Sequence, residues 1–109
     1  MKKGELMKVQ LEFQYFEGCP NHKKMSDNLI RAIEGLENKI DVLNVLVEDE
    51  ETAKRVGFRG SPTLLINGED IEGVSVPENP ALACRYYSPG VPSANSIRDK
   101  IIQQIKQGE

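Results

Sequence analysis

The sequence predicts a single α/β domain with the element order βαβαββα. Three observations lead to this prediction. Apolar and polar residues alternate from Val9 to Phe16, which is the period of a half-buried strand. Apolar residues then recur at steps of three and four from Asn21 to Leu36, which is the period of an amphipathic helix. The chain has 109 residues, enough for one hydrophobic core but not for two.

A break at Glu17-Gly18-Cys19-Pro20 separates the first strand from the first helix. Pro20 suits the first helical turn, because the N–H group that proline lacks has no partner there. The apolar stripe of this helix is formed by Met25, Leu29, Ile33 and Leu36, and Ile30 is expected to widen it.

A second, buried strand is expected over residues 41–47, because five of these seven residues are aliphatic. The acidic run Glu48–Glu51 favours the start of a short helix that continues to Val56 and ends at Gly57. The first two strands should be parallel, because a helix connects them.

The second half of the chain begins with a predicted hairpin. Its strands are Pro62–Ile66 and Asp70–Val74, and Asn67-Gly68 supplies the turn, which requires positive φ. Residues 76–92 contain four of the six prolines and are therefore expected to be mostly loop, with a short helical turn near Cys84. A last helix should begin at Ser93 or Ser96 and bury Ile97, Ile101, Ile102 and Ile105.

These elements make one domain over residues 1–109. Its core covers about residues 8–74, followed by a proline-rich loop over about 75–92 and a C-terminal helix over about 93–107. Helices can then cover both faces of a four-stranded sheet.

Composition excludes several partners. A net charge of −3 gives no basic excess to neutralise phosphates, so nucleic-acid binding is not expected. No apolar run approaches the roughly 20 residues of a membrane helix, and Met1–Met7 is followed by no apolar stretch, so we expect neither a membrane segment nor a signal peptide. The expected location is the cytoplasm, where two cysteines are more often reactive or metal-binding than structural.

Cys19 is the first candidate for chemistry. It ends a strand and opens a helix, where free backbone N–H groups and the helix dipole favour the thiolate. His22 follows three residues later and could donate to the sulfur or stabilise its charge. The alternative is that Cys19 is a small residue at a helix start and His22 a solvated polar one.

The run Val56–Gly68 resembles the cis-proline region of the thioredoxin superfamily, with Arg-Gly-x-Pro-Thr, an apolar strand and an Asn-Gly turn. Together with Gly18–His22 upstream it makes residues 9–74 similar to a thioredoxin fold. The resemblance implies a three-layer α/β fold with a four-stranded mixed sheet. It also implies a cis bond before Pro62, with Ser61 and Pro62 beside Cys19.

The chain departs from the thioredoxin dithiol Cys-x-x-Cys, because His22 stands where the second cysteine would be. In this fold the returning hairpin strand brings the following loop back toward Cys19. Cys84 in that loop could therefore act as the second thiol and pair with Cys19, and Arg85 could stabilise its thiolate. The alternative is that Cys84 is a buried small residue.

Further motifs resemble a group of small bacterial and archaeal thioredoxin-like proteins, some of them labelled alkylmercury-lyase-like. They are Gly18–His22, Ser61–Thr63, Asn67–Glu72, Cys84–Tyr87 and Gly90–Pro92. Asp70 and Glu72 belong to this pattern but more often solvate a hairpin. Tyr86 and Tyr87 are expected to pack the loop onto the domain.

The predicted function is thiol redox chemistry. Cys19 would attack a disulfide, Cys84 would resolve the intermediate, and His22 and Pro62 would tune the site. Ser61, Thr63 and Arg85 would contact the substrate, a protein or a small molecule carrying a thiol or disulfide.

Two alternatives stay open. One is a thiol protein that binds a soft metal or mercury without turnover, and the other is a binding module that kept the fold but not the chemistry. Cys19, His22 and Cys84 suit soft metal ions, but three ligands are fewer than a closed zinc site uses. We therefore expect no resident metal and no cofactor.

Overall fold

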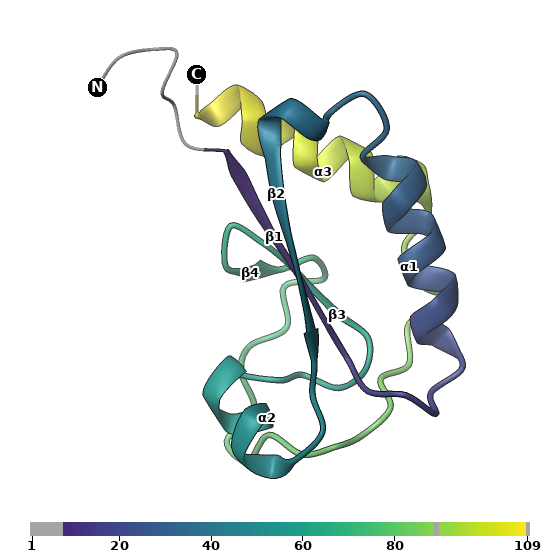
Figure 1. Ribbon diagram of the computed structural model, residues 1–109, viewed down its shortest axis with the longest axis vertical. Helices are drawn as coiled ribbons and strands as arrows, with labels where there is room; N and C mark the ends of the chain where they lie inside the picture. Colours follow the sequence, from purple (N-terminus) through teal and green to yellow (C-terminus); the bar gives the residue numbers. More distant parts are fainter. Residues whose placement is uncertain (1–7, 89, 109) are drawn as a thin grey trace.

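A four-stranded mixed sheet lies at the centre of the structure, a computed structural model that describes residues 8–88 and 90–108 (Figure 1). Met1–Met7, for which we expect no signal peptide, lie outside the described residues, as do Pro89 and Glu109. The strands are β1 (Val9–Tyr15), β2 (Ile40–Leu46), β3 (Thr63–Ile66) and β4 (Glu69–Asp70). The helices are α1 (Asn21–Ala32), the short 3₁₀ helix η2 (Glu37–Lys39), α2 (Glu50–Val56) and α3 (Ala94–Gln107).

The sheet order is β2-β1-β3-β4. β1 pairs in parallel with β2, and antiparallel with β3, which continues into β4 through the Asn67-Gly68 turn. The predicted α/β class, the element order and both strand directions are therefore confirmed. β4 is shorter than the predicted returning strand, because the chain turns at Ile71 and Glu72 directly after it.

Helices α1 and α3 pack side by side on one face of the sheet (Figure 1). Alternate residues of β1, namely Val9, Leu11 and Phe13, point into this core, where they meet the buried residues Met25, Leu29, Ile97 and Ile101 of the two helices. Ile102 and Ile105 are only partly buried, so the stripe of α3 is narrower than predicted. A second, smaller hydrophobic cluster joins α2 to the chain on either side of it. It contains Val47, Ala53 and Phe58.

The helix ends follow the capping signals of the sequence. The side chain of Asp49 accepts a hydrogen bond from the Thr52 N–H at 2.7 Å and caps α2, and Gly57 ends that helix at φ 66°. The Ser93 hydroxyl accepts a hydrogen bond from the Ser96 N–H at 3.1 Å. Of the two serines predicted to begin α3, Ser93 is therefore the cap.

Three local predictions are wrong. β2 is not buried, because it forms the edge of the sheet, and Val42, Leu43 and Leu46 are 40%, 57% and 39% exposed. Ile30 is 58% exposed, so it does not widen the buried stripe of α1. The segment around Cys84 is extended rather than helical, because it pairs with Ser61.

Candidate functional site

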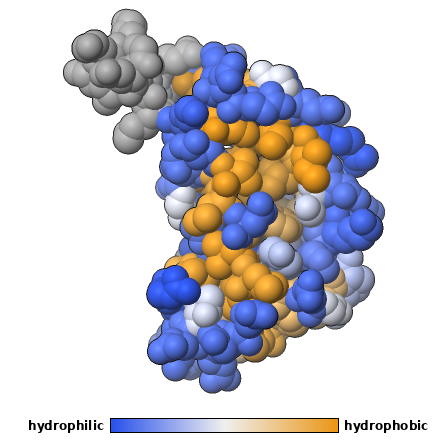
Figure 2. Space-filling model, viewed as in Figure 1, coloured by the Kyte–Doolittle hydropathy of each residue, from blue (hydrophilic) through white to orange (hydrophobic). Residues whose placement is uncertain are grey.

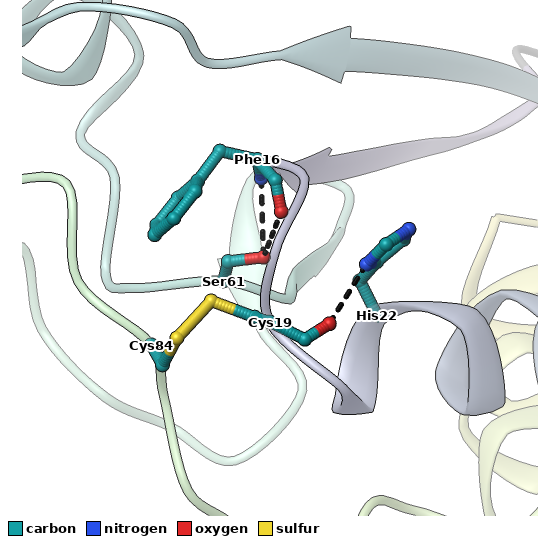
Figure 3. Close-up of a disulfide and its surroundings, with 5 residues drawn as sticks. All are labelled: Phe16, Cys19, His22, Ser61 and Cys84. Atoms are coloured by element: carbon teal, nitrogen blue, oxygen red, sulfur yellow. Dashed lines mark hydrogen bonds between the residues drawn. A yellow bond between two sulfur atoms is a disulfide. The ribbon is translucent and has the colours of Figure 1, made fainter.

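A disulfide joins Cys19 to Cys84 across 65 positions of sequence, with their Cα atoms 5.7 Å apart (Figure 3). Cys19 lies between the end of β1 and the start of α1, and its exposed fraction is only 2%. Cys84 lies in the long loop before α3 and keeps partial access to solvent. The structure thus brings together the two cysteines that the topology argument paired.

Residues 83–87, here called the strap, hold Cys84 against the cis-proline turn. The Ser61 N–H donates to the Ala83 carbonyl oxygen, and the Arg85 N–H donates to the Ser61 carbonyl oxygen, each at 2.8 Å. These two bonds flank Cys84 on both sides in a bridge of β type. The strap is therefore fixed by its backbone as well as by the disulfide.

Gly60 lets the strap come this close. Its φ of +98° is a backbone conformation that residues other than glycine rarely adopt. A Cβ atom at this position would lie 2.9 Å from the Arg85 Cβ and 3.4 Å from the Ala83 carbonyl oxygen. Only glycine satisfies both the backbone angle and the contact.

Ser61 and Pro62 stand beside the disulfide, and the peptide bond between them is cis, as the resemblance implied. Ser61 is fully buried. Its hydroxyl accepts from the Phe16 N–H at 3.1 Å and donates to the Phe16 carbonyl oxygen at 3.3 Å (Figure 3). These bonds tie the cis-proline turn to the chain just before Cys19.

His22 is turned toward the backbone rather than the sulfur. Its Nδ1 lies 2.9 Å from the Cys19 carbonyl oxygen (Figure 3). Its ring also stacks on that of Tyr15, with 5.2 Å between the ring centres. The structure therefore places His22 as a support for the first turn of α1. The predicted direct contact with the thiol is not made in the disulfide form.

Arg85 is engaged with Asp70 rather than with a sulfur. Its guanidinium donates two hydrogen bonds to the two Asp70 carboxylate oxygens, at 2.7 and 2.8 Å, and lies 4.5 Å from the centre of the Tyr87 ring. The Asp70 side chain is fully buried and that of Arg85 is 9% exposed. The strap is thus anchored by a buried, bidentate ion pair.

Burial alone would raise the pKa of Asp70, but the hydrogen bonds from Arg85 and from the N–H groups of Val74 and Glu72 outweigh it and hold the pKa below its ordinary value. Burial raises the pKa of the Tyr87 phenol, whose hydroxyl donates to the Pro62 carbonyl oxygen. Neither side chain is placed to act as a proton carrier at neutral pH.

Thr63 connects the cis-proline turn to the strap. Its hydroxyl donates to the Gly60 carbonyl oxygen at 2.6 Å, and the Arg85 guanidinium lies 3.5 Å from it. It is fully buried, so it contributes to the shape of the turn that receives the strap.

Sequence reasoning missed the role of Asp70, which it assigned to solvation of the hairpin. The signal that could have found it is the joint occurrence of an acidic residue after the Asn-Gly turn and an arginine next to Cys84. Of the two tyrosines in the strap, Tyr87 packs the strap onto the domain as expected, whereas Tyr86 is 80% exposed.

The described residues contain no cluster of three or more His, Cys, Asp or Glu that could hold a metal ion. Within the same residues, no helix is long and apolar enough to cross a membrane.

The comparisons with known proteins reach the fold through structure alone. No protein-family model and no curated protein matches the chain. Among solved structures, the crystal structure of chloroplastic thioredoxin z superposes with a TM-score of 0.61 at 18% sequence identity, covering 93% of this chain and 80% of that one. The likeness shows that the chain has a thioredoxin-like fold.

Proposed function

We propose that the protein is a thiol redox protein whose active couple is Cys19 and Cys84. The observation that carries the proposal is the Cys19–Cys84 disulfide, formed at the N-terminus of α1 and held beside Pro62. A second thiol from the strap supplies what the Cys19–His22 turn lacks. The dithiol is therefore assembled from two distant segments.

The proposed roles follow from the surroundings of each sulfur. Cys19 lies at the positive end of the twelve-residue helix α1, whose first N–H groups have no side-chain cap, so the helix favours its thiolate. This thiolate attacks one sulfur of a partner disulfide, and the other partner sulfur leaves as a thiolate. The Cys84 thiolate then attacks the Cys19 sulfur and releases the second partner thiolate. The partner disulfide gains two electrons and the protein dithiol loses two.

The strap limits access to Cys19. With the strap docked Cys19 is 2% exposed, so a partner disulfide reaches it only in the minor fraction of reduced molecules in which the strap is transiently open. A disulfide in an extended protein segment or in a small molecule fits this requirement, and in the reverse direction a partner thiolate attacks the Cys19–Cys84 disulfide of the oxidised protein. We propose Ser61, Pro62 and Thr63 as the turn that such a partner meets, and the cytoplasm as the compartment in which the couple cycles.

The test traps the mixed disulfide. The variants Cys84→Ser and Cys19→Ser are incubated with insulin or oxidised glutathione, and adducts are mapped by mass spectrometry. We expect a lasting adduct on Cys19 in Cys84→Ser and slow, weak reaction in Cys19→Ser. The reduced wild type should reduce insulin catalytically with dithiothreitol as electron donor.

Two results count against parts of this proposal. An adduct that accumulates faster on Cys84 in Cys19→Ser reverses the two roles. If neither variant reacts and the wild type never turns over, the redox function is wrong and the fold serves as a binding module.

Capture of a soft metal by the reduced thiols is a second candidate. The Ser61 bonds and the Arg85–Asp70 pair do not involve sulfur, so they favour keeping the two thiols close after reduction. Two adjacent thiolates suit Cu(I) or Hg(II). Stoichiometric Hg(II) uptake by the reduced protein, without any insulin reduction, would favour this function over the first.

A further inference from the structure

The outer edge of β2 is an unusual surface for a small domain. Among the described residues no strand pairs with this edge, since β2 is the outermost strand of the sheet. An exposed, apolar edge strand is a template for pairing with another chain, and proteins commonly block such edges with charge, proline or a bulge. Over the seven residues of β2 the only charged residue is Asp41, and there is no proline.

Hydrophobic side chains flank this edge. Figure 2 shows hydrophobic surface running along β2 and across the space between β2 and α1. Four of the eight large hydrophobic residues that are exposed in the described chain belong to these two elements, namely Ile30, Val42, Leu43 and Leu46. None of them contributes to the Cys19–Cys84 site.

The direction of the backbone groups can be deduced from one hydrogen bond. The Val47 N–H donates to the Tyr15 carbonyl oxygen of β1 at 2.7 Å. Because N–H and C=O groups alternate in direction along a strand, those of Val42, Asn44 and Leu46 point away from β1. These residues present the donors and acceptors that an added strand would need.

We propose that two copies of the chain dimerise by antiparallel pairing of their β2 strands, with the two-fold axis at Asn44. Asn44 then faces its own copy, and Val42 faces Leu46 of the second copy on the side of α1. On the other side Leu43 faces Val45 of the second copy. The sheet becomes continuous across the dimer, and the apolar side chains of both edges are covered.

Charge supports a second copy in this direction. The chain after β2 carries four consecutive carboxylates, Glu48–Glu51, whereas Lys8 and Lys39 lie at the start of the paired strands. Antiparallel pairing at Asn44 brings the lysine-bearing start of β2 toward the acidic run that follows β2 in the second copy. Parallel pairing would instead place the two acidic runs side by side, which electrostatic repulsion disfavours.

The first test is the oligomeric state of the full chain by sedimentation equilibrium. We expect a reversible dimer, and Val42→Lys should weaken it by about tenfold or more, since it places a charge in the apolar pairing surface. The matched control is Leu82→Lys, because Leu82 is also 40% exposed but lies in the loop before α3. A wild type that stays monomeric at all concentrations overturns the proposal, as does a dimer that both variants leave equally stable.

Asn44→Pro tests the backbone pairing. The Asn44 N–H points outward, so its removal spares the bonds to β1, while it deletes both hydrogen bonds that the two Asn44 residues exchange at the centre of the dimer. We expect a protein that is folded by circular dichroism and monomeric by sedimentation equilibrium, and a variant dimer as stable as that of the wild type would contradict the proposed pairing. If this variant unfolds, the cross-linking test below decides the matter.

The register is tested by cross-linking. Both native cysteines are in the disulfide, so an added cysteine is the only free thiol. Asn44→Cys should form a disulfide-linked dimer on oxidation, because facing residues of this type lie about 5.5 Å apart. The control Asp41→Cys should not, because its two copies would be about 20 Å apart along the strands. Equal cross-linking of both, or of neither, contradicts the proposed register.

Discussion

Gly60 sets how closely the strap can approach the cis-proline turn. Replacing it by alanine puts a residue with a Cβ atom at a backbone φ of +98° and presses that Cβ atom against Arg85. We expect Gly60→Ala to lower the free energy of unfolding by about 1–3 kcal/mol and to slow the formation of the Cys19–Cys84 disulfide. Denaturant unfolding of the oxidised protein and free-thiol counting during reoxidation measure the two effects.

The matched control for Gly60 is Gly73→Ala. Gly73 also has positive φ, +76°, but a Cβ there would contact nothing within 4 Å. This variant should lose some stability from backbone strain but reoxidise at the wild-type rate. If both variants reoxidise at the same rate, the close contact of Gly60 does not position Cys84.

Asp70 carries the charge that neutralises the buried Arg85. Asp70→Asn should lower the free energy of unfolding by about 3 kcal/mol at pH 7, because breaking a buried pair leaves the guanidinium without its partner. Urea unfolding measures the loss. The control Asp41→Asn removes an exposed carboxylate, paired with Lys8 at 3.8 Å, and should change stability little.

The same carboxylate predicts a pH dependence. The pKa of Asp70 is lower in the folded protein than in the unfolded chain, so its contribution is fully present above the unfolded value of about 3.9 and is lost as the pH falls through the folded value. Urea unfolding between neutral and strongly acidic pH should show this loss in the wild type. An Asp70→Asn variant with the same acid-dependent decline would contradict the assignment.

At the scale of elements, the strap has more anchors than its disulfide. Three kinds of contact hold the strap without sulfur. They are its two backbone hydrogen bonds to Ser61, the Arg85–Asp70 ion pair and the hydrogen bond from Tyr87 to Pro62. We therefore expect the strap to stay docked in most molecules after reduction. Hydrogen exchange should find the Arg85 amide still protected in the reduced wild type and unprotected in reduced Asp70→Asn.

Loss of that protection on reduction of the wild type alone would show that the disulfide is the main anchor. In that case Cys84 would leave Cys19 in the reduced state. The resolving step would then be slow, because the thiol would have to return from solution.

The elements that the sequence predicts correctly are those with local signals. The alternation of β1, the Asn67-Gly68 turn, and the caps at Asp49 and Ser93 all act within a few residues of the element that they define. These signals, with the crossover helix between β1 and β2, predict the element order, the parallel pairing of β1 with β2 and the antiparallel hairpin of β3 and β4. The antiparallel pairing of β3 with β1 followed only from the resemblance to the thioredoxin fold.

The predictions that failed depend on distant parts of the chain. The aliphatic content of β2 does not reveal that no described strand covers its outer side. The strap looks irregular in sequence because its hydrogen-bond partner, Ser61, lies more than twenty residues earlier. Asp70 after the Asn-Gly turn and Arg85 beside Cys84 are both visible in the sequence, but their pairing depends on the hairpin meeting the strap, which is a property of the tertiary structure.

At the scale of the whole molecule, the disulfide links the start of α1 to a segment that follows the entire sheet. The closed loop spans 65 positions, so in a chain-entropy account the disulfide stabilises the fold by about 4 kcal/mol. Guanidinium unfolding with and without a phosphine reductant should show this difference. A reduced protein as stable as the oxidised one would mean that the unfolded chain gains little freedom when the disulfide opens.

The central claim is that Cys19 and Cys84 form one reversible two-electron couple. A redox titration tests it most directly: the protein is equilibrated with graded ratios of reduced to oxidised dithiothreitol, quenched with acid, and its free thiols are counted with the disulfide mapped by mass spectrometry. The account predicts a single transition from two free thiols to none, fitted by a two-electron Nernst curve, with only the intramolecular Cys19–Cys84 disulfide in the oxidised form. Thiols that stay free at every ratio, or that form only intermolecular disulfides, would contradict it.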